Sequence, residues 1–340
     1  MRPVLLRALV TAAVALPFAA GAAATPASTA EEGTEVVSFT DPDIVESSGL
    51  AVVGGRFVTV NDSGDSGRVF AVDPATGDTV GVTSWTPDPV DVEAVAPAYV
   101  DGEAASEVWV GDIGDNRAVR DSVEVLRVPV GWEDATVEPA RYELQYADGP
   151  RDAESVLVVP GTDQLLVVSK GVLGGSFYAA PEQLVAGQVN VLEPLAPALG
   201  VATDAAFFPD GRHLVVRNYG AAAVYTYPGL TEVGSFDLPE QPQGEGIAVD
   251  PDDPGAVLLT TEGPRTPVLR VALPADVSAA MAPESPDAGS TDTPDGGADA
   301  DPAVDPADDG PGWLPWIVGG AGGVVLLVLA VTLARGSRRS

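Results

Sequence analysis

The sequence of 340 residues contains no cysteine. Disulfide bonds, thiolate nucleophiles and cysteine metal ligands are therefore excluded, although an extracellular compartment would permit disulfides. Histidine occurs once, at His213, and lysine occurs once, at Lys170, so nearly all of the basic residues are arginine. A metal site in this chain must consequently be built from oxygen ligands, which favour Ca²⁺ or Mg²⁺ over zinc.

Positive charge is also scarce. The chain has 17 Lys and Arg against 50 Asp and Glu, a formal net charge of −33. This balance argues strongly against nucleic acid or anionic lipid as a partner and makes cations the natural counter-charges. Adaptation to salt or to solubility accounts for much of the same surplus.

Two apolar runs lie near the ends of the chain. Residues 1–24 carry Arg2 and Arg7 beside an apolar run that closes on small residues, which predicts a secretory signal peptide. Residues 313–334 contain no charge and are long enough to cross a hydrocarbon core of about 30 Å, which predicts one transmembrane helix. The basic residues 335–340 follow directly and predict a cytoplasmic C-terminus, so we expect a single-pass protein of the bacterial cell surface with an extracellular N-terminal domain.

Residues 282–312 separate this span from the rest of the chain. They contain nine Asp or Glu and no Lys or Arg, with repeated Pro, Gly and Ala. Such a composition buries too little apolar surface to form a core. We predict a disordered acidic stalk.

Residues 35–275 hold an internal repeat in which an acidic residue heads an apolar, strand-like run. The repeats lie 41 to 61 residues apart, the length of one four-stranded β-propeller blade. Turns rich in Gly, Pro and Asp follow the run in four of the repeats and predict a second strand paired with the first. The five phrases are ESSGLAVV from Glu46, VEAVAPAYV around Glu93, AESVLVV around Glu154, TDAAFF around Asp204 and GEGIAV around Glu245.

The predicted fold class is therefore all-β, a β-propeller of five four-stranded blades. The fifth repeat lacks a fourth strand, whereas the segment EVVSF at residues 35–39 has no blade of its own. Pairing this N-terminal strand with the last blade closes the ring and leaves no open sheet edge. Six blades are the alternative, because residues 115–149 or 178–199 are long enough to hide a degenerate blade.

Two columns of polar residues are predicted to meet at one mouth of the ring, because the first two strands of each blade are antiparallel. Asp91 and Asp152 stand two residues before their Glu and so project to the same side. The first column is Glu46, Glu93, Glu154, Asp204 and Glu245, and the second column is Asp62, Asp112, Lys170, Asn218 and Glu262.

Converging carboxylates repel one another, so this mouth needs a cation or shared protons. We predict a divalent cation site, Ca²⁺ in preference to Mg²⁺. In the alternative, these groups satisfy backbone amides of neighbouring blades. The predicted metal ligands are Glu46, Asp91, Glu93, Asp152, Glu154, Asp204 and Glu245, and the predicted ligand-binding residues are Asp62, Asp112, Asn218, Glu262 and Arg217.

The phrases FFPDGR and AVDPATG resemble turns of WD40-like and YVTN-type propellers. ESSGLA, followed by VND and DVEAVA, resembles the SdiA-regulated and esterase-like phytase propellers. The resemblance covers about residues 35–275 and implies the propeller fold. The Trp-Asp and Gly-His signatures of true WD40 blades are absent.

Three functions remain open at the level of sequence. The first is a monomeric surface module that binds a cation and an unidentified small-molecule or surface ligand. The second, which the phytase-like resemblance implies, is a Ca²⁺-dependent hydrolase of a phosphoester, ester or lactone, with Glu154 and Lys170 as catalytic residues; glycosidase chemistry is a third option. His213 opens a second strand and is expected at the opposite rim, which argues against a Ser-His-Asp triad.

Overall fold

The computed structural model describes residues 28–29, 32–62, 64–100 and 102–282. The predicted signal peptide, transmembrane segment and basic tail, and all of the predicted stalk after residue 282, lie outside these residues. Within the described ranges, no helix combines the length and apolarity that a membrane crossing requires.

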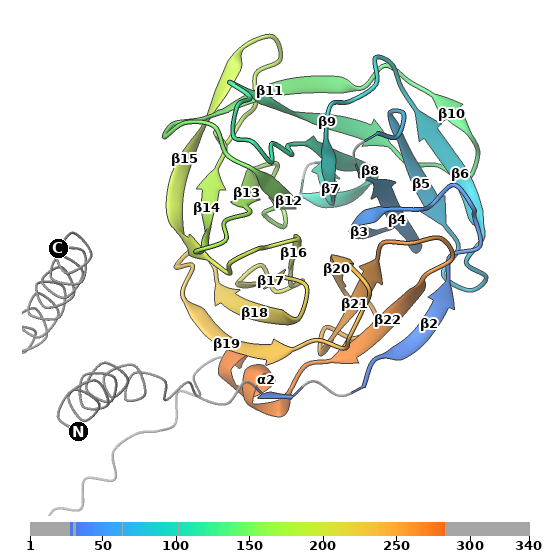
Figure 1. Cartoon of the computed structure of the whole chain (residues 1–340), viewed down its shortest axis with the longest axis vertical. Helices are drawn as coiled ribbons and strands as arrows, with labels where there is room; N and C mark the ends of the chain where they lie inside the picture. Colours follow the sequence, from blue (N-terminus) through green and yellow to red (C-terminus); the bar gives the residue numbers. More distant parts are fainter. Residues whose placement is uncertain (1–27, 30–31, 63, 101, 283–340) are drawn as a thin grey trace, which may run out of the picture. The chain divides into compact units, whose positions relative to one another are not determined.

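The described residues form an all-β, propeller-like fold, as the repeat predicts (Figure 1). Antiparallel strands are arranged in groups, which we number 1 to 5. Group 1 contains β3 (Ser47–Val53), β4 (Arg56–Asn61), β5 (Arg68–Val72) and β6 (Thr79–Ser84). Group 2 contains β7 (Val92–Val100), β8 (Glu103–Asp112), β9 (Val123–Pro129) and β11 (Ala140–Tyr146). Group 3 contains β12 (Ala153–Val158), β13 (Leu165–Ser169), β14 (Gly175–Ala179) and β15 (Val189–Ala198).

Groups 4 and 5 complete the arrangement. Group 4 contains β16 (Asp204–Phe207), β17 (His213–Arg217), β18 (Ala221–Thr226) and β19 (Glu232–Asp237). Group 5 contains β20 (Gly244–Val249), β21 (Ala256–Thr261), β22 (Pro267–Ala272) and β2 (Thr34–Ser38). The N-terminal strand β2 pairs antiparallel with β22, from Thr34 opposite Arg270 to Ser38 opposite Pro267. The predicted closure of the last group by the N-terminal strand is confirmed.

Three parallel pairings add strands at the outer edges of the groups. The strand β11 pairs with β15 and joins groups 2 and 3 into one eight-stranded sheet. The two-residue strands β10 (Ala135–Thr136) and β1 (Ser28–Thr29) pair with β6 and β19. These pairings cover β11 and β15 along four residues and cover β6 and β19 at two residues each.

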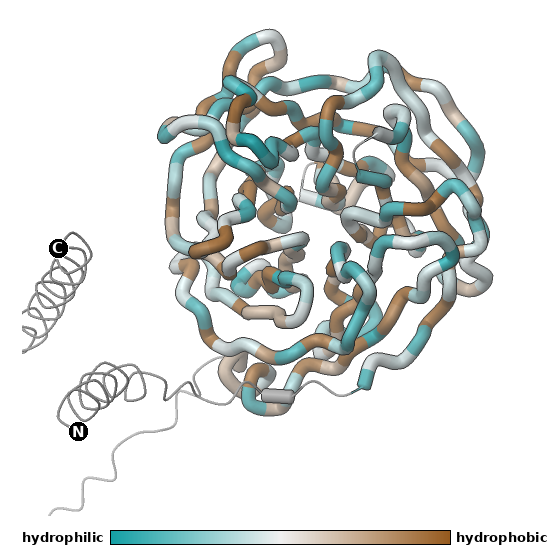
Figure 2. Tube along the Cα trace, viewed as in Figure 1, coloured by the Kyte–Doolittle hydropathy of each residue, from teal (hydrophilic) through white to brown (hydrophobic). Residues whose placement is uncertain are grey.

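The core is divided into clusters that lie between successive groups. One cluster joins each neighbouring pair, and the last joins group 5 to group 1, where Phe70 packs with Leu258. Trp109 is 2% exposed in the cluster between groups 2 and 3. Figure 2 shows apolar residues recurring along the strands of every group. Strands that are buried on both faces explain why the sequence has near-continuous apolar runs.

The innermost strands form a closed ring, in the order β3, β7, β12, β16 and β20 (Figure 1). Two glycines allow this close approach. A Cβ at Gly49 would lie 2.8 Å from the backbone nitrogen of Val95, and one at Gly246 would lie 3.0 Å from the carbonyl carbon of Gly49. A Cβ does not fit at the first distance and would be crowded at the second, so glycine at both positions allows the inner strands to converge.

A short helix, α2 (Ala275–Met281), follows the last strand. Its buried residue Val277 packs against β19, where its Cγ2 is 3.1 Å from the position a Cβ would take at Gly234. The repeat pattern does not predict this helix, because seven residues span only about two turns, which is too short to establish a helical period.

Candidate functional site

The structure brings the starts of the first strands and the ends of the second strands to the same rim. Asp204 is paired with Arg217, and Val92 is paired with Asp112. We call the carboxylates gathered here, together with the one lysine, the acidic mouth. Its members are Glu46, Asp62, Asp91, Glu93, Asp152, Glu154, Lys170, Glu245 and Glu262.

Three of these carboxylates form a compact group. Asp62, Asp91 and Glu93 each offer an oxygen within 4.8 Å of the others. Glu93 is 4% exposed, and the other two side chains are partly buried. A Cβ at Gly114 would lie 2.5 Å from Asp91 Oδ2 and 2.7 Å from Glu93 Oε1. Glycine at this position therefore leaves room beside the three carboxylates.

The side chain of Asp112 holds the backbone next to Asp91 in place. Its two oxygens accept hydrogen bonds from the backbone N–H groups of Val90 (2.9 Å) and Asp91 (3.0 Å). Arg120 Nη1 lies 2.9 Å from Asp112 Oδ1. Asp112 is predicted as a ligand-binding residue, but the structure gives it these three partners and 2% exposure. It orients the loop that carries Asp91.

A charged pair occupies the side of the mouth formed by group 3. Lys170 Nζ lies 2.6 Å from Glu154 Oε1 and 5.7 Å from the ring centroid of Tyr219. Glu154 is 3% exposed. Burial raises the pKa of Glu154 to about 8, although Lys170 acts in the opposite direction. Burial lowers the pKa of Lys170, but the Glu154 carboxylate outweighs it, so that the pKa lies above its ordinary value.

Burial and mutual repulsion also affect the other carboxylates. The pKa of Glu93 is raised to about 10, first by burial and then by Glu154 and Asp62. Burial raises the pKa of Asp152, whose Oδ1 accepts a hydrogen bond of 2.8 Å from the backbone N–H of Asp115. In the absence of a cation, the mouth therefore retains protons near neutral pH.

Glu245 and Glu262 lie on the side of the mouth formed by group 5. Gln243 Nε2 donates to Glu245 Oε1 at 3.2 Å and to Glu262 Oε1 at 2.6 Å. Glu245 is 3% exposed, and its second oxygen, Oε2, has no hydrogen-bond partner among the described residues. Burial and repulsion from Glu245 raise the pKa of Glu262 to about 7. Glu46 is partly buried at the same rim.

Two predicted ligand-binding residues have structural partners instead. Arg217 is fully buried and donates from Nη1 to the carbonyl oxygens of Gly246 (3.0 Å) and Thr260 (3.3 Å). Burial lowers its pKa to about 10. Asn218 Oδ1 accepts from the backbone N–H groups of Gly220 and Ala221 and so stabilises the turn between β17 and β18.

Asp204, a predicted metal ligand, connects three strand groups. Its Oδ2 accepts hydrogen bonds from the backbone N–H groups of Ile247 in β20 (2.8 Å) and Leu50 in β3 (3.3 Å), and its Oδ1 accepts from Ala205 (2.8 Å). It is 1% exposed. Burial raises the pKa of Asp204 well above its ordinary value, and the three amides act in the opposite direction. This residue fits the alternative in which carboxylates satisfy amides of neighbouring blades.

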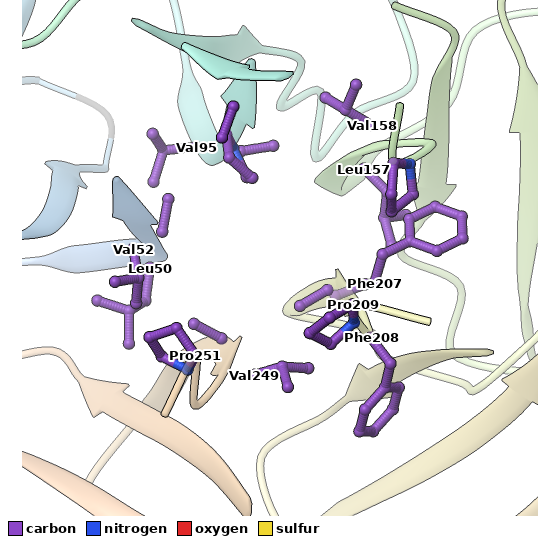
Figure 3. Close-up of a pocket in the computed structure, with 18 of the residues that line it drawn as sticks. Leu50, Val52, Val95, Leu157, Val158, Phe207, Phe208, Pro209, Val249 and Pro251 are labelled. Carbon is purple, nitrogen blue, oxygen red and sulfur yellow. The ribbon is translucent and has the colours of Figure 1, made fainter. Parts of the chain in front are cut away.

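An apolar cavity lies among the same inner strands (Figure 3). It has a volume of about 190 Å³ and is lined by residues of β3, β7, β12, β16 and β20. Figure 3 shows Val52, Val95, Phe207 and Val249 around this space. The inner strands thus present carboxylates at one end and apolar side chains further along.

His213 lies at the opposite rim, as predicted. It begins β17, whereas Arg217 at the other end of this strand is paired with Asp204. Its Nδ1 lies 2.7 Å from Asp210 Oδ2, and it is 8% exposed. It therefore takes no part in the acidic mouth.

Sequence reasoning missed three supporting residues. Ser48 Oγ donates to Glu93 Oε2 at 3.2 Å, Gln243 links two carboxylates, and Arg120 pairs with Asp112. Ser48 stands two residues after Glu46, and Gln243 stands two residues before Glu245, so the period of a strand was an available signal. No comparable signal identifies Arg120, which lies in the loop between β8 and β9.

No protein-family profile and no curated protein match the chain, so the resemblance to the SdiA-regulated and esterase-like phytase families is not confirmed. Among solved structures, hydrazine synthase of Kuenenia stuttgartiensis is similar over 72% of this chain, with 16% identity and a TM-score of 0.35. The chain covers 59% of that protein's chain.

Replacing Asp204 is expected to destabilise the fold. Asp204→Leu has a similar volume but leaves the amides of Leu50, Ala205 and Ile247 without acceptors, at a cost of about 1–3 kcal/mol per buried amide. Urea unfolding followed by circular dichroism measures the loss. The exposed residue Asp237 provides the control variant Asp237→Leu. Equal unfolding midpoints for the two variants would contradict a structural role of Asp204.

The stability of the metal-free protein is expected to fall as pH rises. A carboxyl whose pKa is raised on folding stabilises the protein fully below its ordinary value of 4.5, and this contribution is lost as pH rises through about 7 for Glu262, 8 for Glu154 and 10 for Glu93. Carboxyls with lowered pKa, such as Asp65, lose their contribution only below their ordinary value of 3.8.

Thermal melts in EDTA at pH 5, 7 and 9 test this expectation. The melting temperature is expected to decrease along the series, and Glu93→Gln is expected to reduce the decrease, because a neutral amide does not lose a proton. Glu103→Gln, at an exposed position, serves as the control. Melting temperatures that rise from pH 5 to pH 9 would show that the mouth is ionised in the folded state.

Proposed function

We propose that this chain is a membrane-anchored, cell-surface β-propeller whose acidic mouth binds a divalent cation, Ca²⁺ in preference to Mg²⁺, together with a ligand. The observation that carries the proposal is the group of Asp62, Asp91 and Glu93, whose oxygens lie within 4.8 Å of one another. In this proposal strand groups 1 to 5 are the five blades, with β2 completing the fifth.

The donor set fits a hard cation. Carboxylate oxygens are the ligands that Ca²⁺ prefers, and no cysteine is available anywhere in the chain. Desolvated carboxylates at this separation repel one another, as the raised pKa of Glu93 indicates. A divalent cation relieves this repulsion and releases the protons that the mouth otherwise retains.

The three carboxylates leave coordination positions open for a ligand. Ca²⁺ takes about 6–8 oxygen ligands, more than this group provides. Side chains at the rim supply further contacts, because Lys170 is partly exposed and Tyr219 is 40% exposed. An oxygen-rich ligand that reaches the ion and Lys170 together is the class that this chemistry supports.

The cellular location rests on the sequence. A signal peptide at residues 1–24 and an uncharged run at residues 313–334, followed by arginines, place the propeller outside a membrane and hold it there. The acidic residues 282–312 act as the stalk between them. The large negative charge disfavours nucleic acid as a partner.

One observation favours a second function, metal-assisted hydrolysis of an ester, phosphoester or lactone. The pKa of Glu154, about 8, suits proton transfer near neutral pH, and the ammonium of Lys170 lies beside it. In that function the cation polarises the substrate, Glu154 moves a proton and Lys170 stabilises developing negative charge.

Cation binding is expected to stabilise the protein. Millimolar CaCl₂ is expected to raise the melting temperature of the full chain in detergent, and EDTA to lower it, because an ion bound only by the folded state stabilises by mass action. Asp91→Asn and Gly114→Ala are expected to reduce the Ca²⁺-dependent shift. The first removes a charged oxygen, and the second places a Cβ against Asp91 and Glu93.

Glu103→Gln, which removes an exposed carboxylate outside the mouth, is expected to retain the full shift. Superimposable melts of the unaltered protein in CaCl₂ and in EDTA would refute the cation site. A shift that both mouth variants retain would assign binding to other residues.

Turnover distinguishes the two functions. Under hydrolysis, the protein is expected to cleave members of an ester, phosphoester and lactone panel only with Ca²⁺, and Lys170→Met is expected to lower kcat by about 100-fold, the usual cost of losing a transition-state donor. Lys170→Arg, which keeps the charge, controls for electrostatics. If no substrate in the panel is cleaved in a Ca²⁺-dependent manner, the hydrolase function is refuted and the binding function stands.

A further inference from the structure

A buried arginine without an acceptor lies at the rim opposite the acidic mouth. Arg56 begins β4, whose last residue, Asn61, is paired with Ser47 next to the mouth. Arg56 is 6% exposed, and its Nε and Nη1 have no hydrogen-bond partner among the described residues. It also belongs to none of the ion pairs that these residues form. The described part of the chain therefore leaves the charge of Arg56 unmatched.

The described residues include one other arginine buried to this extent, Arg217, and it is supplied with acceptors. It donates to the carbonyl oxygens of Gly246 and Thr260 and to Gln241 Oε1 at 3.1 Å. An arginine carries its charge permanently, so its burial is costly unless oxygens accept its N–H groups. The contrast with Arg217 indicates that Arg56 takes its acceptor from a bound molecule.

The ring of Trp132 covers Arg56. Arg56 Cζ lies 4.0 Å from the centroid of this ring, which is a cation–π contact. The ring attracts the charge, but Nε and Nη1 remain without acceptors. A Cβ at Gly54 would lie 3.3 Å from Nη1, so glycine in the turn before Arg56 keeps space beside this nitrogen. Trp132 is 54% exposed, so much of its side chain faces solvent and not the core.

The loop that carries Trp132 joins β9 to β10 and is anchored on both sides of the tryptophan. The backbone N–H of Val130 donates to the carbonyl oxygen of Ser106 at 2.9 Å. Asp134 Oδ1 accepts a hydrogen bond of 2.9 Å from the backbone N–H of Val82. The side chain of Trp132 is therefore a cover that can turn toward solvent while the backbone stays in place.

We propose that Arg56 and Trp132 form a second ligand site, which binds the carboxylate of a small organic acid. The guanidinium supplies the donors, and a carboxylate matches its planar fork. The ring of Trp132 turns aside to admit the anion and then packs against its apolar part. This site lies at the other rim from the acidic mouth and does not depend on the cation site of the proposed function.

The charge of the surroundings favours a ligand with a single negative charge. Glu133 and Asp134 follow Trp132 directly, in a chain of net charge −33. A doubly charged anion is repelled by these charges more strongly than a monocarboxylate is. Phosphate at pH 8 is therefore expected to bind more weakly than a monocarboxylate.

Tryptophan fluorescence of the full chain in detergent and EDTA tests the site, with sodium propionate at pH 8 as the probe. Propionate is expected to change the fluorescence saturably, because the ring of Trp132 moves. Arg56→Met is expected to abolish this change, and Arg56→Lys to weaken binding about 10-fold through loss of a charge-assisted hydrogen bond. Arg212→Met removes an exposed arginine from the corresponding turn of group 4 and is expected to retain the full change.

Sodium chloride at the same ionic strength and Trp132→Phe are the controls. Trp132→Phe keeps an aromatic cover but removes the reporter, so the fluorescence change is expected to disappear while propionate still raises the melting temperature. An equal response to chloride, binding of phosphate as tight as that of propionate, or a saturable change retained by Arg56→Met would each overturn the proposal. If Arg56→Met does not fold, the melting temperature of the unaltered protein decides, and a value equal in propionate and in chloride overturns the proposal.

Discussion

The carboxylate of Asp204 is the interaction on which the geometry of the inner ring depends. This one side chain accepts hydrogen bonds from backbone N–H groups in strands of groups 1, 4 and 5, and it is almost entirely buried. These strands are far apart in the sequence and are not covalently connected near Asp204. The shared acceptor therefore fixes how the strands are aligned along their length and how closely they approach. Since the chain has no cysteine, contacts of this kind and the apolar clusters between groups hold the ring together.

The spacing of the inner strands then decides the character of the mouth. Glycines at positions 49 and 246 bring neighbouring strands close together, and the carboxylates at the strand ends are brought close as well. Their desolvation raises the pKa of Glu93 and Glu154, so the metal-free mouth is neutralised by protons and by Lys170. The same burial that stabilises the ring therefore gathers carboxylates whose negative charge is costly unless protons or a nearby cation neutralise it.

Much of the fold was predictable from the repeat. An acidic residue before an apolar run marked the first strand of each group, and turn residues marked the second strand. The closure by β2 was predictable because residues 35–39 form a strand-like segment that belongs to none of the five repeats. The two-residue strands and α2 were not predictable, because their few residues depend on partners from other groups.

The all-β repeat, the absence of thiolate ligands and the rim at which the carboxylates gather can all be read from the residues in their order along the chain. The individual roles of the carboxylates depend on contacts between distant repeats. Glu93 and Asp204 hold the same place in their repeats, but the shorter side chain of Asp204 meets the amides of Leu50 and Ile247, while Glu93 joins Asp62 and Asp91. Which groups meet across the ring depends on the packing of strands from distant repeats, and the local sequence pattern carries no information about that packing.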